Sequence, residues 1–539
     1  RRILRRAARF GRNLGMRDPF IHRIVEAVVQ SMGSQYPEVR ERQAHIERVI
    51  RGEEESFNAT LDRGLEIFDA VVARLSPSTS FPGDEAFKLY DTYGFPLDLT
   101  QLMAEEKGLV VDTQAFERLM AEQKDRARGA RKSAAQGAAD AGTGAALLGA
   151  ADAKKMDVSA FKERSRFIGY TELRAETSVV QVQGNLVVVA ASPFYGESGG
   201  QVGDTGVLRT PAGELEVIDT VRNDALTILV LSRPVELAAA TALTAEVSEG
   251  RRRNIERNHS ATHLVHEAIR RVLGTHAHQQ GSLVSPDHLR FDFNHFERIT
   301  PDQLREIEEI VNTKIADRIA VNALNDPSEW LTIDEAKRRY PNVKMFFGDK
   351  YGDRVRIVEI DPAFSVELCG GTHVRSTGEI GLFKIVSEAS VASGIRRIEA
   401  VTGEGLRRYI GVRTEKLGEL DAHLEKLLRD QEDLVRQLGA FAPVQAPVRP
   451  SLGAFRTSED AAAALSSLDQ LERERQDAID AVVAASQEFR KELSSHRMKE
   501  ASQGIDAIAA GGETVNGVRV VAASVTVGDM EELKQLGDA

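Results

Sequence analysis

The sequence is poor in cysteine, because Cys369 is the one cysteine among 539 residues. A single thiol excludes an internal disulfide framework and favours a reducing compartment, so we expect a cytoplasmic protein. Long hydrophobic runs are also lacking: no stretch of about 18 or more apolar residues occurs, and no membrane-spanning helix is predicted. The first residues carry arginines without an apolar segment or a cleavage site, which excludes a secretory signal.

The charge balance is acidic, with 82 acidic and 70 basic side chains and a formal net charge of -12. This balance argues against indiscriminate binding of nucleic acid by the whole surface, but it is compatible with a local basic patch. The length predicts about three to four domains of ordinary globular composition. Because the sequence does not begin with methionine, we expect a fragment of a longer chain.

A basic segment opens the chain. Against one acid, Asp18, the first turns hold eight arginines: Arg1, Arg2, Arg5, Arg6, Arg9, Arg12, Arg17 and Arg23. Apolar residues such as Ile3, Leu4 and Phe10 interleave with them, which predicts an amphipathic helix with one strongly basic face. Such a face is either solvated or in contact with phosphate groups, and the pattern favours neither.

Hydropathy patterns and turn residues predict an α+β multidomain chain. We expect a helical region at 1–128, a linker rich in Ala and Gly at 129–159, a small β-barrel at 160–250, an α+β domain at 251–405, helical arms at 406–511 and the truncated start of an α/β domain at 512–539. The barrel prediction depends on five short strands separated by turns: Val179–Val182, Leu186–Val189, Leu215–Val217, Leu226–Val230 and Leu243–Val247. Between them, the Gly-rich segment 197–204 is either a simple bulge or a functional loop.

The helical arms are interrupted by the segment from Pro443 to Pro450, which cannot lie inside a helix. Leucines recur on both sides of this break, so we expect the two arms to form an antiparallel helical pair. Beyond residue 512 the pattern predicts strands at Val518–Val521 and Ser524–Val527 and a helix from 530. Two strands and part of a helix cannot close a core, so we expect this end to be cut as well.

Two short motifs carry candidate metal ligands. His259 and His263 are four residues apart, and on a helix both side chains would project from one face. Cys369 and His373 have the same spacing, with two glycines between them that allow a tight backbone. Three imidazoles and a thiolate form a typical tetrahedral zinc set. Four protein ligands would make a structural site, whereas a catalytic zinc needs an open position, and the sequence does not decide between them.

Taken together, five segments resemble alanyl-tRNA synthetase, and they occur in that family's order: Asp91 to Pro96, Glu197 to Asp204, His259 with His263, Gly281 to Val284, and Cys369 to Val374. The resemblance covers essentially the whole chain and is looser after residue 410. It implies that the family's class II aminoacylation core, which uses ATP and Mg²⁺, lies upstream, and that the C-terminal domain is represented only by its first elements.

The resemblance also implies roles for single residues. His259, His263, Cys369 and His373 match the zinc ligands of the editing domain, and Gln279 matches a residue of the editing pocket that influences which aminoacyl group is accepted. The helical region would approach the acceptor stem of tRNA(Ala) and its G·U pair. Asp91 matches an acidic residue used there, and Arg2, Arg5, Arg6 and Arg9 are candidate tRNA contacts. The family's C-terminal region can also mediate self-association.

An editing activity has a physical reason. A site built for alanine cannot exclude the smaller glycine, and it discriminates poorly against serine, which adds one hydroxyl. Such differences are worth about 1–3 kcal/mol, so a second hydrolytic site is needed. The sequence does not identify the general base. Two alternatives remain: a free-standing editing deacylase, against which the helical region at 1–128 argues, and a non-catalytic RNA-binding module with a structural zinc.

Overall fold

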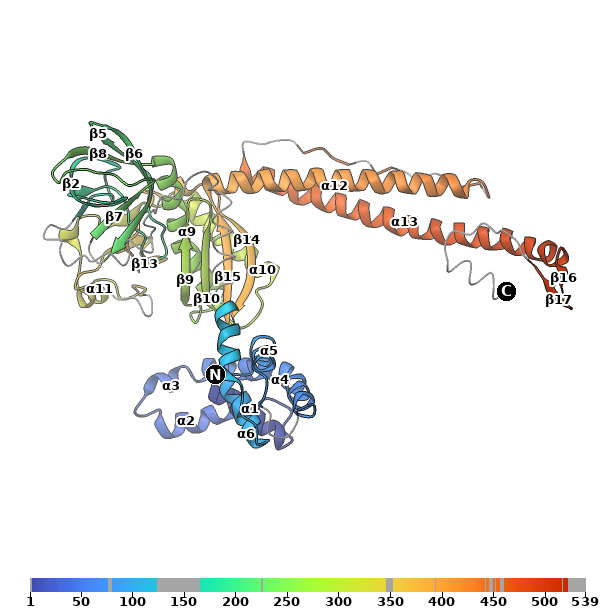
Figure 1. Cartoon of the computed structure of the whole chain (residues 1–539). Coiled ribbons are helices and arrows are strands. Elements are labelled where there is room, and N and C mark those ends of the chain that lie inside the picture. Colours follow the sequence, from blue (N-terminus) through green and yellow to red (C-terminus); the bar gives the residue numbers. More distant parts are fainter. Residues whose placement is uncertain are drawn as a thin grey trace. The chain divides into compact units, whose positions relative to one another are not determined.

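The structure is a computed structural model that divides into two compact units, Arg1–Thr402 and Gly403–Ala539 (Figure 1). It describes residues 2–75, 80–123, 165–223, 226–345, 352–392, 394–441, 443–444, 449–450, 452–455, 460–515 and 517–521. The predicted linker at 129–159 therefore lies outside the described residues. Among the described residues, no helix is both long and apolar enough to cross a membrane.

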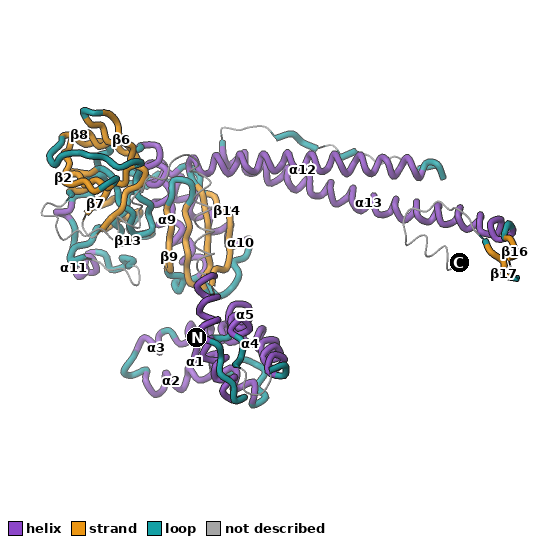
Figure 2. The backbone as a smooth tube through the Cα atoms, viewed as in Figure 1, coloured by secondary structure: helices purple, strands orange, loops and turns teal. Residues whose placement is uncertain are grey.

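The first part of the chain is helical, as predicted. Its helices are α1 (Arg2–Asn13), η1 (Ile21–Arg23), α2 (Ile24–Met32), α3 (Pro37–Glu41), α4 (Gln43–Val72), α5 (Gly83–Tyr93) and α6 (Leu97–Glu106), and residues 113–123 are helical too (Figure 2). The long helix α4 supplies Phe57, Leu61 and Phe68 to a core that also buries Phe81 and Phe95. Phe68 and Phe81 stack with ring centroids 4.9 Å apart.

The basic face of α1 does not point outward, so that expectation is wrong for Arg5 and Arg9. Arg5 pairs with the buried Glu53, Arg9 with Glu106, and Arg12 with Asp62. These arginines are spaced by four and three residues, so they share one helical face, and acids elsewhere in the chain turn that face inward. Arg6 is exposed, and the side chain of Arg2 is not described.

The predicted barrel is present as a closed sheet in the order β2-β3-β7-β6-β5-β8. Its strands are β2 (Arg174–Gln183), β3 (Leu186–Val189), β5 (Gly206–Thr210), β6 (Gly213–Asn223), β7 (Leu226–Leu231) and β8 (Ala242–Val247). The sequence prediction included all of these except β5. Two short strands, β1 (Arg166–Phe167) and β4 (Ala191–Ser192), pair in parallel beside the barrel. Alternate side chains fill its interior, among them Val189, Leu208 and Leu229.

The following segment packs the long helix α9 (Glu249–Leu273) on a four-stranded sheet in the order β14-β15-β10-β9. These strands are β9 (Gln279–Val284), β10 (Leu289–Asn294), β14 (Lys384–Ala392) and β15 (Ile395–Val401). Leu264 and Val265 of α9 share one core with Phe291 and Phe293 of β10. The helix α10 (Pro301–Ala316) begins with a capping box at Thr300 and packs against α9.

A smaller sheet completes this unit, in the order β11-β12-β13. Its strands are β11 (Val321–Ala323), β12 (Ile357–Ile360) and β13 (Ser365–Leu368), and the short helical elements nearby are η2 (Pro327–Glu329), α11 (Ile333–Arg339) and η3 (Thr377–Ile380). All four residues of β13 are buried, including Glu367. The loop that begins at Cys369 follows this strand directly, so a rigid element positions its first residue.

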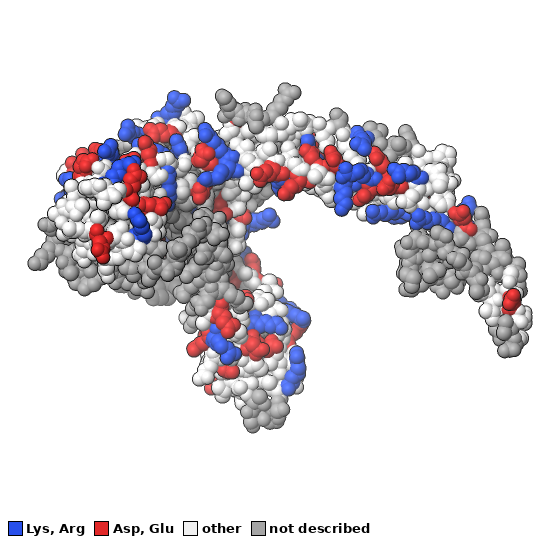
Figure 3. All heavy atoms as spheres, turned by 45° about the horizontal axis from the view of Figure 1, so that its top comes forward, with Lys and Arg blue, Asp and Glu red and all other residues white. Residues whose placement is uncertain are grey.

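The second unit contains the two predicted helical arms, α12 (Gly403–Leu438) and α13 (Ala461–Ala510), but they run parallel and not antiparallel. Paired residues advance together along both helices: Arg413 with Asp469, Asp421 with Arg475, and Gln437 with Arg497. On the face that Figure 3 shows, acidic and basic side chains alternate along this pair.

The connection between the arms explains why a parallel pair can form. Residues 439–460 join the end of α12 to the start of α13, and a chain of this length can span roughly 70 Å. The return path is marked by contacts back along α12. Arg449 binds Glu432, Leu452 packs beside Leu424, and Phe455 packs beside Leu417.

After α13 the chain forms a hairpin of β16 (Glu513–Val515) and β17 (Val518–Val520), so the predicted strand at Val518–Val521 is confirmed. The predicted second strand at Ser524–Val527 and the helix from residue 530 lie outside the described residues.

Candidate metal centre

The four predicted ligands come together. His259 and His263 lie one turn apart on α9 with their rings stacked at 5.3 Å, and Cys369 and His373 come from the loop after β13. Their ligand atoms all lie within 4.8 Å of one another. Cys369 Sγ is 3.4 Å from Nε2 of both His259 and His373. Two donors that share a tetrahedral zinc at ordinary bond lengths are about 3.5 Å apart, so these separations fit a common ion.

Each of the three imidazoles is oriented by a partner on its other nitrogen. Nδ1 of His259 lies 2.7 Å from Gln201 Oε1, Nδ1 of His263 lies 2.7 Å from Glu367 Oε2, and Nδ1 of His373 lies 3.1 Å from Ser260 Oγ. Such partners set the tautomer and leave Nε2 for a metal.

One atom is a direct test of fit. His263 Nε2 is buried and has no hydrogen-bond partner among the described residues. A buried polar atom without a partner costs free energy, and a cation bonded to it would remove that cost. The donor set, the separations and this atom all fit a zinc ion.

Sequence reasoning missed the residues that support the ligands. Glu367 is 1% exposed and also contacts Nδ1 of His266 and Oγ of Ser365, each at 3.1 Å. No sequence signal pointed to Glu367, because Ser365–Leu368 alternates polar and apolar residues, a pattern that predicts a solvent-exposed glutamate. Gln201 gave no signal either. Its carboxamide bridges His259 and Thr372, and Thr372 is 171 residues away in the sequence.

The electrostatics of the cluster favour an ionised thiol. Burial alone would raise the pKa of Cys369, but the imidazoles of His259 and His373 lower it well below its ordinary value. Burial would likewise raise the pKa of Glu367, and the contacts with His263 and His266 lower it well below the usual range. A thiolate is the form of cysteine that binds metals, so this electrostatic environment favours the binding of a cation.

Three residues of the cluster, His259, His263 and Cys369, line a cavity of about 880 Å³, whereas His373 lines a smaller cavity of about 200 Å³. Gln279, Gln280 and Ser282 of β9 line the larger cavity, and Gln279 Nε2 lies 3.3 Å from Ser282 Oγ. The Gly-rich loop reaches it through Gly199 and Gly200, so that loop is more than a bulge. Gly200 has a φ of +85° and a Cβ there would lie 2.3 Å from Ser282 Oγ, so only glycine fits this approach.

The cavity does not include every polar residue that follows α9. Nε2 of His276 lies 3.1 Å from Nδ1 of His295, and Nδ1 of His278 lies 3.2 Å from Arg270. Neither His276 nor His278 is among the residues that line the cavity. Gln279, the pocket residue that the resemblance implied, therefore lies at the cavity, and these two histidines do not.

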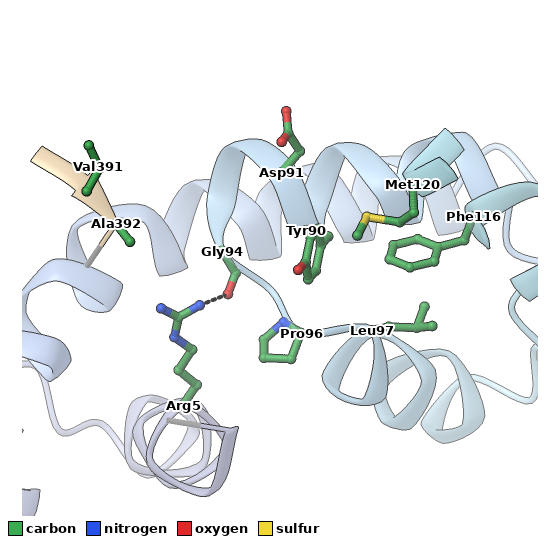
Figure 4. Close-up of a pocket in the computed structure, with 10 residues that line it drawn as sticks. All are labelled: Arg5, Tyr90, Asp91, Gly94, Pro96, Leu97, Phe116, Met120, Val391 and Ala392. Atoms are coloured by element: carbon green, nitrogen blue, oxygen red, sulfur yellow. Dashed lines mark hydrogen bonds between the residues drawn. The ribbon is translucent and has the colours of Figure 1, made fainter. Parts of the chain in front are cut away.

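Asp91 lies far from this cluster in the sequence, on the last turn of α5, beside another cavity of about 750 Å³ (Figure 4). Its side chain is exposed and accepts a hydrogen bond from Gln123 Nε2. In Figure 4 Arg5 points instead at the carbonyl of Gly94, to which it donates a hydrogen bond. Asp91 therefore keeps an accessible carboxylate, whereas the charge of Arg5 is used within the protein.

A pair of glycine variants tests the geometry of the ligand loop. A Cβ on Gly371 would lie 2.0 Å from Cε1 of His259 and 2.7 Å from Oε1 of Gln201, whereas a Cβ on Gly370 meets nothing within 4 Å. We expect Gly371→Ala to displace His259 and lower zinc affinity by about 10- to 100-fold, and Gly370→Ala to bind zinc like the parent. Chelator competition measures both, and equal losses in the two variants would contradict the close approach of Gly371 to His259.

Two family models match parts of this chain. Residues 1–251 match the family "tRNA synthetases class II (A)", and residues 355–399 match the "Threonyl and Alanyl tRNA synthetase second additional domain". The second match contains Cys369 and His373.

Curated relatives are similar over most of this chain. An alanine–tRNA ligase from Chlorobaculum tepidum is 44% identical over 451 residues, which are 80% of this chain and 49% of that protein. One from Chlorobium phaeobacteroides is 42% identical over 492 residues, 88% of this chain and 53% of that protein. One from Desulforamulus reducens is 42% identical over 463 residues, 81% and 50% respectively. The chain thus spans about half the length of these relatives, and it belongs to the alanyl-tRNA synthetase family.

Proposed function

We propose that this chain hydrolyses tRNA(Ala) mischarged with serine or glycine, and that the intact protein attaches alanine to tRNA(Ala) with ATP and Mg²⁺. The editing proposal depends on one observation: three of the four candidate ligands, His259, His263 and Cys369, line the 880 Å³ cavity, so a metal ion held by the cluster would face it. A cavity of this size falls within the range of small-ligand sites.

His259, His263, Cys369 and His373 would hold a zinc ion, which their mixed nitrogen and sulfur donors favour. Bound there, zinc would supply a Lewis acid for the ester of the aminoacylated 3′ end. The chain's own contribution is to orient the ligands through Gln201, Glu367 and Ser260 and to present polar groups beside them.

Gln279 supports discrimination between serine and alanine. Its carboxamide lines the cavity and contacts Ser282, so two polar side chains of β9 face the same space. A site that hydrogen-bonds a hydroxyl rejects an analogue without it, because its own polar groups would then lack a partner. The hydroxyl of serine, which alanine lacks, is the group that such a wall would recognise.

Two other functions compete with this one. A non-catalytic RNA-binding module with a structural zinc is consistent with four protein ligands, which can close a tetrahedral site. The cavity beside the ligands favours hydrolysis over this alternative. A free-standing editing deacylase would not need the helical region that occupies residues 2–123, so we place it last.

The proposal predicts that the zinc-loaded chain releases serine from Ser-tRNA(Ala) and leaves Ala-tRNA(Ala) largely intact. We expect Gln279→Leu to reduce this preference by about 10- to 100-fold, because the wall then lacks a partner for the hydroxyl. Deacylation rates with both substrates measure the preference. A chain that binds zinc and tRNA(Ala) but releases no serine would establish the binding-module alternative.

We further propose that the helical region meets the acceptor stem through Asp91 and through exposed cations such as Arg6, with Arg5 and Arg9 omitted because they pair internally. Self-association of the intact protein through its C-terminal region and a cytoplasmic location remain part of the same proposal. The location is supported by the single cysteine, since a chain without a disulfide framework is typical of a reducing compartment.

A further inference from the structure

The loop that carries the ligand Cys369 is held by a buried arginine outside the ligand set. Arg356, which directly precedes β12, is 4% exposed. Its Nη1 donates hydrogen bonds to the carbonyls of Cys369 at 3.0 Å and Gly371 at 2.8 Å, and its Nη2 donates to Asn325 Oδ1 at 2.6 Å. The backbone adds a further bond, from the amide of Cys369 to the carbonyl of Arg356 at 3.1 Å. A planar guanidinium suits this task because its donors have a fixed geometry.

Tyr170, from the segment that precedes β2 of the barrel, binds the carbonyl of Gly370, which lies between those of Cys369 and Gly371. Tyr170 Oη donates to the carbonyl of Gly370 at 2.7 Å, across 200 residues of sequence. The Tyr170 ring is itself held on two sides. The guanidinium carbon of Arg356 lies 4.1 Å from its centroid, and the ring of Phe167 packs edge-on at 4.8 Å. Two side chains that contact each other thus bind three consecutive carbonyls of the ligand loop.

The peptide bond between Gly370 and Gly371 links this contact to the sulfur. In a trans peptide the carbonyl and the N–H point in opposite directions. The carbonyl of Gly370 faces Tyr170, so the N–H of Gly371 faces the other way, where it donates to Cys369 Sγ at 3.4 Å. The Tyr170 hydroxyl therefore orients the peptide group that stabilises the thiolate. Hydrogen bonds in such a series polarise and strengthen one another.

We infer that Arg356 and Tyr170 are positioning residues, which hold the Cys369–Gly371 loop so that the sulfur faces the three imidazoles. The inference rests on the metal site of the proposed function and adds two residues to it. It also gives the segment before the barrel a part in metal binding, because Tyr170 reaches the loop from there. Neither side chain is a ligand itself, since each donates to backbone carbonyls.

Tyr170→Phe is the decisive variant, because it removes one hydroxyl and keeps the ring that packs on Phe167. We expect its zinc dissociation constant to rise about 10-fold. The chain has a single cysteine, so a thiol reagent reports on Cys369 alone. Alkylation of the zinc-loaded variant should be faster by a similar factor, and kcat for serine release should fall more than KM changes. Arg356→Lys keeps the positive charge but lacks the planar guanidinium with its several N–H donors. We expect its loss of zinc affinity to be at least as large as that of Tyr170→Phe.

Arg271 supplies a matched control. It also binds a backbone carbonyl, that of Ala363 at 2.9 Å, and lies over an aromatic ring, that of Phe364 at 4.4 Å, but it does not contact the ligand loop. Arg271→Lys should keep the zinc affinity and the alkylation rate of the parent. If the parent binds zinc and releases serine while Tyr170→Phe and Arg356→Lys match it in affinity and alkylation, the inference is overturned and the proposed function stands. If the parent binds no zinc, both are overturned.

Discussion

Replacing His263 by alanine is expected to lower zinc affinity by about 100-fold or more and to abolish the release of serine from Ser-tRNA(Ala). His263 is 3% exposed, its Nε2 has no protein partner in the described part of the chain, and its Nδ1 is held by Glu367. Loss of a supporting residue alone costs about 10- to 100-fold in metal affinity, so loss of a ligand should cost more. Elemental analysis and deacylation assays measure the two effects.

A histidine elsewhere on a helix controls for this change. His423 of α12 is exposed, and His423→Ala should leave zinc content and deacylation as in the parent. Zinc content that survives His263→Ala unchanged would remove this histidine from the ligand set. Zinc lost with deacylation retained would instead make the ion structural.

The second large effect is expected from Arg252→Met, which should destabilise the barrel and the start of α9 by about 3–5 kcal/mol. Arg252 and Asp204 are both fully buried and form an ion pair, with Arg252 Nε 3.0 Å from Asp204 Oδ2. Arg252 also donates to the carbonyls of Gly169 at 2.7 Å and Pro193 at 3.0 Å. Removing the cation leaves a buried carboxylate and two buried carbonyls without their partner.

Hydrogen exchange of the barrel amides measures this loss as a free energy of opening. In the double variant Arg252→Met with Asp204→Asn, the buried charge is gone, so part of the stability should return. Arg305 pairs with Asp302 on the surface, with side chains 73% and 83% exposed, and Arg305→Met should cost less than about 1 kcal/mol. Equal losses of opening free energy for Arg252→Met and Arg305→Met would show that the buried ion pair stabilises the protein no more than the exposed one.

The candidate metal ligands could be found from the sequence because the spacing within each pair is local. Four residues on a helix bring His259 and His263 to one face, and the glycines allow Cys369 and His373 to converge. The residues that orient them could not be found this way. Tyr170 and Gln201 reach the loop across 200 and 171 residues of sequence, and no local pattern encodes such contacts.

In the fold, too, features encoded by local sequence patterns were predicted, and features that depend on contacts between distant residues were not. Alternating apolar residues revealed most barrel strands, but β5 was missed because its apolar run, Val207 and Leu208, is too short to show a period. Helical periodicity predicted both arms of the second unit but not their relative direction, which depends on contacts such as those of Arg449 and Phe455 with α12. Counting arginines in α1 likewise said nothing of the acids, such as Glu53, that turn them inward.

The parallel arrangement of α12 and α13 makes the second unit a spacer. In an antiparallel pair the chain would return beside Gly403, where α12 begins. Here Gln437, near the end of α12, is level with Arg497, and α13 continues to Ala510. With a helical rise of about 1.5 Å per residue, the hairpin at Glu513–Val520 therefore lies roughly 70–80 Å from Gly403. Shortening both helices by equal numbers of turns would reduce the distance between Gly403 and the hairpin by about 5.4 Å per turn.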